Sequence, residues 1–404
     1  MNPNPKVSII IMNFNRWQDT LECLESVYQI EYPNYDVIVV DNASEDESLG
    51  KIREYSQGLT KVDSKLVKYK RKEKSLKLFE FHENNETNLL NPNHHSNPHE
   101  SKIDNILKIE GCVTYTLDET NSKDNTNSNI SKTSEDYLSE IMALPSNEKL
   151  IVLENRVNYG YTKGNNLAID FALKNIDSDY ILLLNEDTVV ASDFLDNLVD
   201  VAEQNNEVGC VGPKVYYYDY KGRKDVISFA GEKINLYTSL GNRFCKNKVD
   251  KDICDKIIET DKIEGCSILF KKEALLKVGL FDHIYWAYWE ETDLCFRIRN
   301  QGYKVLYAPK ARIWHKIGLT WDNYYSYYII YHYLVRNRLI FIWRYASLLQ
   351  KIVFFILFPF YLTIHMVIMI ITKDKDTSKN GFRAVKDGFR DFKALRNKRL
   401  IYYL

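Results

Sequence analysis

The stretch Val7-Ser-Ile-Ile-Ile-Met-Asn-Phe-Asn15 decides the fold. Its continuous apolar run is rich in β-branched residues, which is typical of a parallel strand covered on both faces. Apolar residues at helical spacing follow over residues 17–28, and Asp36 to Val40 predicts a second buried strand. Strand, helix and strand in this order form a right-handed crossover unit. We therefore expect an α/β fold with a Rossmann-like, mostly parallel central sheet flanked by helices.

Polar side chains stand where these two predicted strands end. Asn13 and Asn15 follow the first strand, and Asp41 follows the second. Open α/β sheets bind their ligands at the carboxyl ends of the strands. We therefore expect these three side chains to contact one ligand.

A second run of α/β pattern begins near residue 150 and ends in an acidic triplet. A strand over residues 150–153 leads through a glycine-containing loop and a helix to the strand Tyr180 to Leu184, which Asn185-Glu-Asp187 follows. A carboxylate at the exit of a buried strand offers the oxygen ligand that Mg²⁺ or Mn²⁺ prefers, so Asp187 is a candidate metal ligand. A turn or helix-capping role is the alternative.

Three carboxylates lie among aromatic side chains in the stretch Trp286-Ala-Tyr-Trp-Glu-Glu-Thr-Asp-Leu-Cys-Phe-Arg297. Bulky aromatics favour burial, and burying an unpaired charge is costly, so a merely solvated acidic face is disfavoured. The apolar spacing that follows predicts a short helix with Thr292 or Asp293 as its N-cap. Glu290 and Glu291 would then precede a helix N-terminus, which favours their ionised form. A capping box without a catalytic role is the alternative.

The composition narrows the class of protein. The chain has 404 residues, 45% of them hydrophobic, and can bury a large core. Its seven cysteines are odd in number and never form a CxxC pair, which argues against a disulfide framework and against a zinc site. The N-terminus lacks a charged-then-apolar signal sequence, so we expect a reducing, cytosolic environment. Nucleic acid is not an expected partner.

Residues 58–149 differ in composition from the rest of the chain. Asn, Lys, Ser and Glu dominate them, so we read this range as a low-complexity polar insertion. Two short apolar patches, Leu76 to Phe81 and residues 109–115, are compatible with an edge hairpin. His94 and His95 are more typical of a solvated loop than of a metal-binding tract.

The C-terminal part is aromatic, then apolar, then basic. Residues 324–333 predict a helix suited to a membrane surface, and Ile352 to Thr372 is long enough to cross a hydrocarbon layer of roughly 30 Å. Pro359 interrupts that segment, and a single span would put basic residues on the side that the positive-inside tendency disfavours. A transmembrane segment and a re-entrant or interfacial hairpin bent at Pro359 both stay open. Residues 373–404 carry ten Lys/Arg against four Asp, a surplus of six, which favours anionic lipid.

Six motifs occur in the chain in a fixed order: Val-Ser-Ile-Ile-Ile-Met-Asn-Phe-Asn15, Val-Asp-Asn-Ala-Ser44, Asn-Tyr-Gly-Tyr-Thr-Lys-Gly-Asn-Asn166, Leu-Leu-Asn-Glu-Asp-Thr188, Gly-Leu-Phe-Asp282 and Tyr-Trp-Glu-Glu-Thr-Asp-Leu294. Together they resemble the family 2 glycosyltransferases, especially the rhamnosyltransferase-like branch, over residues 6–57 and 150–345. The resemblance implies a GT-A fold, a nucleotide-sugar donor, Mn²⁺ or Mg²⁺ as cofactor, and inversion at the anomeric carbon.

The resemblance also implies roles for single residues. Donor-binding residues would be Asn13, Asn15, Asp41, Asn42, Gly160, Lys163, Asn165, Asn185 and Glu186. Asp187 would bind the metal together with His315, although a lone histidine is more often structural. The catalytic group would comprise Glu291, Glu290 and Asp293. Apart from the resemblance, Trp286 and Trp289 are candidates for an apolar wall that contacts the acceptor sugar, with core packing as the alternative for at least one of them. The family has Asp where this chain has Glu291, so the base is one of two adjacent glutamates, and we choose Glu291.

These inferences combine into one expected protein. It is a membrane-associated transferase at the cytoplasmic face of the cell membrane, with or without one C-terminal transmembrane segment, acting on a glycan or lipid-linked acceptor. A catalytically inactive GT-A-fold adaptor is the alternative, and a sugar nucleotidyltransferase is disfavoured because no Gly-rich, Lys-containing loop follows Met12. The expected regions are a catalytic domain of residues 1–57 and 150–322 (donor half 6–57 and 150–190, acceptor half 191–322), the insertion 58–149, the membrane region 323–372 and the basic tail 373–404.

Overall fold

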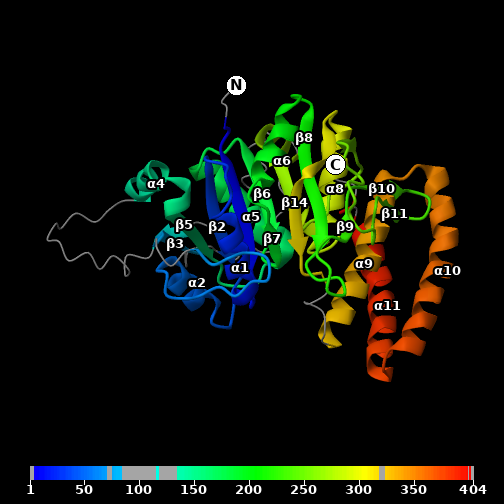
Figure 1. Ribbon diagram of the computed structural model, residues 1–404. Coiled ribbons are helices and arrows are strands. Elements are labelled where there is room, and N and C mark those ends of the chain that lie inside the picture. Colours follow the sequence, from blue (N-terminus) through cyan, green and yellow to red (C-terminus); the bar gives the residue numbers. More distant parts are fainter. Residues whose placement is uncertain are drawn as a thin grey trace.

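The structure is a computed structural model that describes residues 4–70, 75–83, 115–117, 134–317, 324–398 and 400–401. Figure 1 shows a central sheet between helices, with three long C-terminal helices standing together beyond one end of the sheet. The two strands expected first are β1 (Val7–Asn13) and β2 (Tyr35–Asp41). They pair in parallel with Asn13 opposite Asp41, so the two polar strand ends are adjacent, as predicted.

The remaining elements alternate between helix and strand over most of the chain. The helices are α1 (Trp17–Val27), α2 (Ser48–Ser56), α4 (Ser134–Ala143), α5 (Gly160–Asn175), α6 (Phe194–Glu203), α7 (Lys272–Val278), α8 (Glu290–Asn300), α9 (Tyr324–Tyr345), α10 (Leu348–Thr372) and α11 (Lys375–Asn397), with single 3₁₀ turns at Ser146–Glu148 and His283–Tyr285. The other strands are β3 (Lys77–Glu83), β4 (Tyr115–Leu117), β5 (Lys149–Glu154), β6 (Tyr180–Asn185), β7 (Thr188–Val190), β8 (Val208–Tyr217), β9 (Ile227–Phe229), β10 (Glu232–Asn235), β11 (Leu240–Arg243), β12 (Ile258–Glu259), β13 (Ser267–Lys271) and β14 (Lys304–His315).

The main sheet has a parallel centre and antiparallel additions. Its order is β12-β14-β8-β13-β6-β1-β2-β5-β3-β4, with β7 paired to β14 and β9 to β8. The strands β6, β1, β2, β5 and β3 all run parallel, whereas β13 runs antiparallel between β6 and β8. The predicted α/β class with a mostly parallel central sheet is confirmed.

Two hydrophobic layers cover the faces of this sheet. Ile9 belongs to a layer formed with α1, α2 and α6, and its neighbour Ile10 belongs to a layer formed with α4, α5, α7 and α8. Successive side chains of a strand point to opposite faces, so an uninterrupted apolar run needs helices on both sides. The β-branched run at Val7–Asn13 is explained by this double cover.

Part of the range predicted as an insertion belongs to the sheet. Strand β3 covers most of the apolar patch Leu76 to Phe81 and pairs in parallel with β5 and antiparallel with β4 at the edge of the sheet, whereas residues 109–114 of the second patch lie outside the described residues. Helix α4 buries Ile141 in the core. His94, His95 and Cys112 lie outside the described residues.

One disulfide joins Cys245 to Cys254, with their Cα atoms 6.6 Å apart. This pairing corrects the expectation of no disulfide. The chain after β11 folds back on itself and brings the two residues within bonding reach, a proximity that their spacing of nine residues does not reveal. Disulfides persist mainly in oxidising compartments. This disulfide therefore does not support the expected cytoplasmic location, which stays a prediction.

The helix α10 is the one described helix that is long and apolar enough to cross a membrane, judged by length and composition alone. It continues unbroken through Pro359, which rules out a hairpin bent at that residue, one of the two alternatives left open by the sequence. Phe354, Phe358 and Leu362 recur on one buried face and pack in the cluster shared with α9 and α11. That lateral packing stabilises the helix across the proline, which lacks the N–H for one helical hydrogen bond.

Candidate active site

The donor corner predicted at the ends of β1 and β2 is a closed hydrogen-bond network. Asn13 Nδ2 donates to Asp41 Oδ1 (2.6 Å) and to Ser44 Oγ (3.0 Å), and Ser44 Oγ donates to Asp41 Oδ1 (2.6 Å). Asn13 and Asp41 are fully buried. Asn15 is exposed and has a positive φ of 55°, with its Oδ1 accepting from Glu45 N–H at 2.7 Å. Asn13 and Asp41 therefore shape the turn that presents Asn15 at its surface.

The loop before α5 is tied to the same corner by Asn42. Asn42 Nδ2 donates to Asn158 Oδ1 (2.9 Å), and its Oδ1 accepts from Tyr159 N–H (3.1 Å). Gly160 has a φ of 71°, and a Cβ there would collide with the Trp286 ring, so the position requires glycine. Thr162 N–H donates to the Trp286 carbonyl at 3.1 Å. A hydrogen bond thus joins the start of α5 to the stretch that carries Glu290 and Glu291.

Two other residues predicted to bind the donor lie on α5. Asn165 is buried and donates to the Tyr161 carbonyl at 2.8 Å. Lys163 Nζ lies 4.3 Å from the centre of the Tyr159 ring. The first turn of α5 therefore carries a cation beside the donor corner.

Asp187 and His315 meet at the ends of β6 and β14. Asp187 Oδ1 lies 3.2 Å from His315 Nε2, and β7 brings the two together by pairing Thr188 with His315. Burial by itself would raise the pKa of Asp187, but the charge of the nearby His315 lowers it. Burial and the charge of Asp187 raise the pKa of Glu186. The predicted metal pair is therefore brought together, with Asn185 and Glu186 directly before it.

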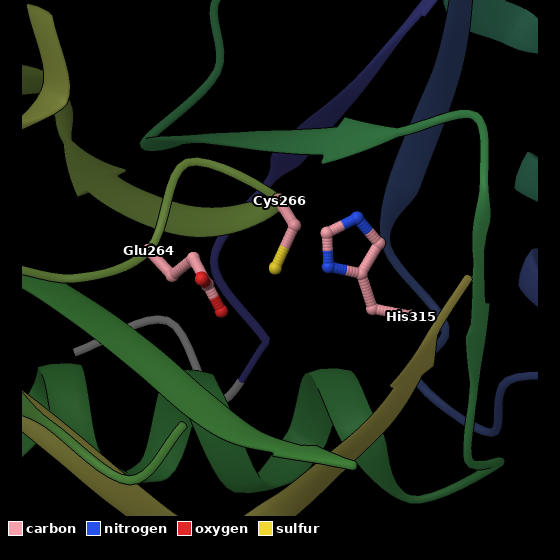
Figure 2. A group of neighbouring side chains, drawn as sticks. All are labelled: Glu264, Cys266 and His315. Atoms are coloured by element: carbon pink, nitrogen blue, oxygen red, sulfur yellow. The ribbon is translucent and has the colours of Figure 1, made fainter. Parts of the chain in front are cut away.

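A segment that sequence reasoning did not select, residues 264–266, lies beside this pair. Cys266 and Glu264 point toward the His315 ring (Figure 2), and the potential ligand atoms of these three residues lie within 4.8 Å of one another. The Cys266 carbonyl accepts from Asn185 N–H at 2.9 Å. Cys266 therefore lies against the acidic triplet as well as His315.

The helix α8 begins at Glu290, three residues earlier than the predicted cap allowed. Its N-cap is Trp289, in a left-handed conformation with φ 73°, so Thr292 and Asp293 are inside the first turn instead of capping it. Trp286 and Tyr288 also have positive φ. Such angles are costly for bulky residues and persist only where neighbouring contacts enforce them. The strained loop places both glutamates in the first turn of α8.

The two glutamates of α8 have different surroundings. Glu291 Oε1 accepts from Lys262 Nζ at 2.8 Å in a partly buried ion pair. Glu290 is buried, and its Oε2 has no hydrogen-bond partner among the described residues. Burial, and then the charge of Glu291, raise the pKa of Glu290 well above its usual range. The raised pKa favours the protonated form of Glu290.

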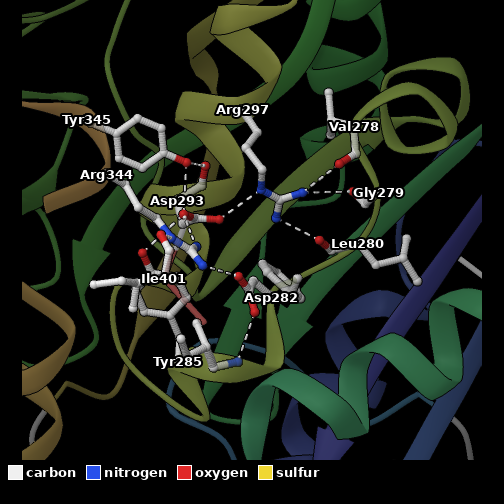
Figure 3. Close-up of polar contacts among 12 residues, drawn as sticks. Val278, Gly279, Leu280, Asp282, Tyr285, Asp293, Arg297, Arg344, Tyr345 and Ile401 are labelled. Atoms are coloured by element: carbon white, nitrogen blue, oxygen red, sulfur yellow. Dashed lines mark hydrogen bonds and ion pairs between the residues drawn. The ribbon is translucent and has the colours of Figure 1, made fainter. Parts of the chain in front are cut away.

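Asp293 lies at the centre of a buried charge network (Figure 3). Its Oδ2 accepts from Arg297 Nε at 2.8 Å, and its Oδ1 accepts from Tyr345 Oη (2.8 Å) and lies 3.1 Å from both Arg344 Nη1 and Tyr285 Oη. Both oxygens face these partners, and the residue is fully buried. Asp293 was expected to be catalytic, but its contacts are those of a residue that positions α8.

The two tryptophans predicted to bind the acceptor are half-buried and pack on α9. Trp286 stacks on Tyr333 with ring centres 5.0 Å apart, and Trp289 lies 4.9 Å from the Phe341 ring. Asn337 Nδ2 lies 2.9, 2.7 and 2.7 Å from the carbonyl oxygens of residues 285, 287 and 288, respectively. Helix α9 therefore holds the backbone of the strained loop.

Four residues of the site could not be selected from sequence alone: Lys262, Cys266, Asn337 and Arg344. Each lies in a segment without a recognisable motif and reaches the site through tertiary contacts. The one available signal was the Arg336-Asn-Arg338 run, which directly follows the aromatic residues 324–333 that predicted a membrane-surface helix. The amide side chain of Asn337 within this run was the clue to a structural role.

Comparison with known proteins defines the class of the chain. A family model described as "Glycosyl transferase family 2" matches residues 8–79, and one described as "Glycosyltransferase like family 2" matches residues 125–326, half of the chain. The chain belongs to the family 2 glycosyltransferases, as the six motifs predicted.

Relatives among characterised proteins include rhamnosyltransferases. The rhamnosyltransferase WbbL of Escherichia coli (strain K12) is 25% identical over 45% of this chain and 72% of its own length. N-acetylglucosaminyl-diphospho-decaprenol L-rhamnosyltransferase of Mycobacterium tuberculosis is 24% identical over 34% of this chain and 47% of its own length. The predicted likeness to the rhamnosyltransferase branch is confirmed.

Other matches are partial or distant. The glucosyl-dolichyl phosphate glucuronosyltransferase of Haloferax volcanii is 28% identical over 41% of this chain and 49% of its own length. This chain therefore spans only about half the length of the mycobacterial and archaeal relatives. A mannosyltransferase from Pyrobaculum calidifontis, solved with GDP-Man and Mn²⁺, aligns over 99% of this chain and 84% of its own at 12% identity, with a TM-score of 0.47.

We expect Asp293→Asn to destabilise the protein by about 3–5 kcal/mol, because Arg297 and Arg344 would lose a buried counter-charge. Urea unfolding followed by tryptophan fluorescence measures the change. Asp200→Asn, an exposed change on α6, is the matched control and should shift stability by less than about 0.5 kcal/mol. Equal unfolding midpoints for the Asp293 variant and the control would contradict the role of this network.

Proposed function

We propose that this protein is a metal-dependent, inverting glycosyltransferase that moves a sugar from a nucleotide-sugar donor to a hydroxyl of a glycan or lipid-linked acceptor. The observation that carries the proposal is the position of residues 264–266. Cys266 adjoins His315 and Asn185, while a Cβ on Gly265 would lie 3.8 Å from Glu291 Cγ. One short segment thus joins the metal pair to the carboxylate pair.

The proposed metal ligands are Asp187 and His315. Asp187 Oδ1 is buried and makes no hydrogen bond of acceptable geometry among the described residues, which fits a carboxylate oxygen available to a cation. When bound, Mn²⁺ or Mg²⁺ would neutralise charge on the departing diphosphate. Lys163 and the exposed Asn15 are proposed to contact the donor, and Asn185 and Glu186 to border its phosphates.

Glu291 is the proposed general base. Inverting transfer needs one carboxylate to take the proton of the acceptor hydroxyl while its oxygen attacks the anomeric carbon, and no covalent intermediate is formed. A base must be ionised before the reaction. Glu291 Oε1 lies 2.8 Å from the ammonium group of Lys262, whereas the raised pKa of Glu290 favours its acid form. Lys262 would also hold Glu291 in one orientation.

A lipid-linked acceptor is supported by the names of two relatives, one acting on a diphospho-decaprenol compound and one on a dolichyl phosphate compound. Trp286 and Trp289 are proposed to border the acceptor sugar with the parts of their rings that α9 leaves exposed. Substrates in a membrane require the active site to lie close to the lipid surface.

The C-terminal helices support attachment along a membrane surface. Outward-facing apolar side chains run the length of α10, among them Phe360 (67% exposed), Ile364 (60%) and Ile371 (76%). Helix α11 packs beside it and carries exposed Arg383 and Arg390. If α10 crossed the bilayer, it would draw these charges inward at a cost of about 2.5–3.5 kcal/mol each. We therefore favour α10 lying in the interface, with the basic residues near anionic headgroups.

We expect Asp187→Ala to abolish Mn²⁺ binding at the donor site and to lower donor turnover by about 100-fold or more, because a metal contributes several kcal/mol to such a reaction. Electron paramagnetic resonance of free Mn²⁺ and an assay of nucleotide release measure the two effects. Asp200→Ala is the control. Unchanged Mn²⁺ binding and turnover would remove Asp187 from the site.

The two glutamates are separated by a paired substitution. Glu291→Gln should lower turnover by roughly 10²- to 10⁴-fold with donor binding retained, whereas Glu290→Gln, which resembles the protonated acid, should cost less than about tenfold. Glu273→Gln on the exposed side of α7 is the control. Steady-state turnover and calorimetric donor binding are the measurements. The reverse order of effects would assign the base to Glu290.

The surface mode of α10 is tested by vesicle flotation and alkaline extraction. The chain should float with anionic vesicles more than with neutral ones, and alkaline carbonate should release it. Phe360→Glu with Ile364→Glu should lower flotation by more than about half, because both side chains face outward, while Leu59→Glu, at a 72% exposed site outside the C-terminal helices, should leave it unchanged. Resistance to alkaline carbonate would indicate a transmembrane helix instead.

A further inference from the structure

His315 presents its two ring nitrogens to different partners. Nε2 faces Asp187 at 3.2 Å. On the opposite side, Figure 2 shows Nδ1 facing the Cys266 sulfur, with the Glu264 carboxylate on the same side of the ring. The contact with Asp187 therefore explains the position of Nε2 of His315, whereas the position of Nδ1 is still to be explained.

The atoms on this second side are buried and incompletely bonded. His315 Nδ1 and Glu264 Oε2 are buried without a hydrogen-bond partner of acceptable geometry among the described residues. Glu264 Oε1 accepts from Arg243 Nη1 at 2.9 Å, which fixes the carboxylate and leaves Oε2 facing inward. Cys266 is 2% exposed. Buried polar atoms normally find partners, so this grouping calls for a ligand.

We propose that Glu264, Cys266 and His315 form a second cation site that takes a thiophilic divalent ion such as Zn²⁺. Imidazole, thiolate and carboxylate are the ligands of zinc, and three protein ligands with one open position form a recurrent zinc arrangement. A thiolate disfavours Mg²⁺, which selects oxygen ligands. On binding, the Cys266 thiol releases its proton to water and its sulfur forms the bond to the ion.

The spacing of the ligand atoms is close to what zinc requires. Bonds of about 2.1–2.3 Å in a tetrahedron separate neighbouring ligand atoms by about 3.6 Å. The three atoms lie within 4.8 Å of one another, so a contraction of about 1 Å closes the site. The sequence argued against zinc because no CxxC pair is present, whereas this site draws its ligands from two separate segments.

Cobalt provides a direct test of the thiolate ligand. The full-length protein, purified with its disulfide intact and stripped with a chelator, is titrated with Co²⁺ and then Zn²⁺ under anaerobic conditions. We expect a near-ultraviolet sulfur-to-cobalt charge-transfer band at one equivalent, which Zn²⁺ displaces. Cys266→Ser should abolish the band and weaken Zn²⁺ binding by more than the roughly 10- to 100-fold typical of substitutions outside the ligand set.

Cys210→Ser, which removes a buried thiol elsewhere in the core, is the matched control and should keep the band. The absence of a band in the wild-type protein, or its persistence in Cys266→Ser, would overturn the proposal. If circular dichroism shows that Cys266→Ser does not fold, Glu264→Gln replaces it. That variant should keep the band but bind Zn²⁺ more weakly, and unchanged Zn²⁺ affinity would overturn the site.

A functional consequence rests on the proposed function. An imidazole that binds Zn²⁺ through Nδ1 has its Nε2 protonated and cannot also bind the donor metal. Zn²⁺ should therefore inhibit Mn²⁺-dependent turnover of the wild-type protein, and the ratio of turnover with and without Zn²⁺ should be closer to one in Cys266→Ser. If the cobalt band is present but Mn²⁺ supports no turnover, the proposed transferase activity fails while the cation site stands.

Discussion

The buried ion network around Asp293 is the interaction on which the rest of the site depends. Arg297 ties the carboxylate to the chain before α8, and Arg344 ties it to α9 and, through Asp282, to the loop that precedes the strained tryptophans. Buried charges such as these are stable only while each of them keeps its oppositely charged partner. The first turn of α8, with both glutamates, is therefore held from the C-terminal helices as well as from the chain at the end of α7.

This arrangement explains why a strained loop persists. Three bulky residues, Trp286, Tyr288 and Trp289, keep positive φ angles. Asn337 satisfies the carbonyl groups of this loop, and stacking on Tyr333 and Phe341 holds its rings. Contacts from α9 therefore offset the backbone strain of this loop. The orientation of Glu290 and Glu291 depends on these tertiary contacts and not on the local sequence alone.

The sequence predicted those features that depend on local pattern. The β-branched run at Val7, the polar strand ends at Asn13 and Asp41, and the triplet ending at Asp187 all follow from periodicity and strand position. The start of α8 was mispredicted because propensity gives Thr292 or Asp293 as the cap, whereas contacts with α9 set the backbone of Trp289. The neighbourhood of Cys266 and His315 was missed for the same kind of reason, since sheet pairing brings together segments that share no motif.

The packing of α9 limits how the C-terminal region could be exchanged between relatives. A membrane-binding segment that only tethers an enzyme is replaceable by any other of similar hydrophobicity. Here Asn337, Tyr333 and Arg344 belong at once to the C-terminal helices and to the support of the carboxylate pair. Inheritance of α9 should therefore be linked to inheritance of the loop at residues 285–289, and a protein shortened to improve its solubility would lose the support of the carboxylate pair along with the apolar helix α10.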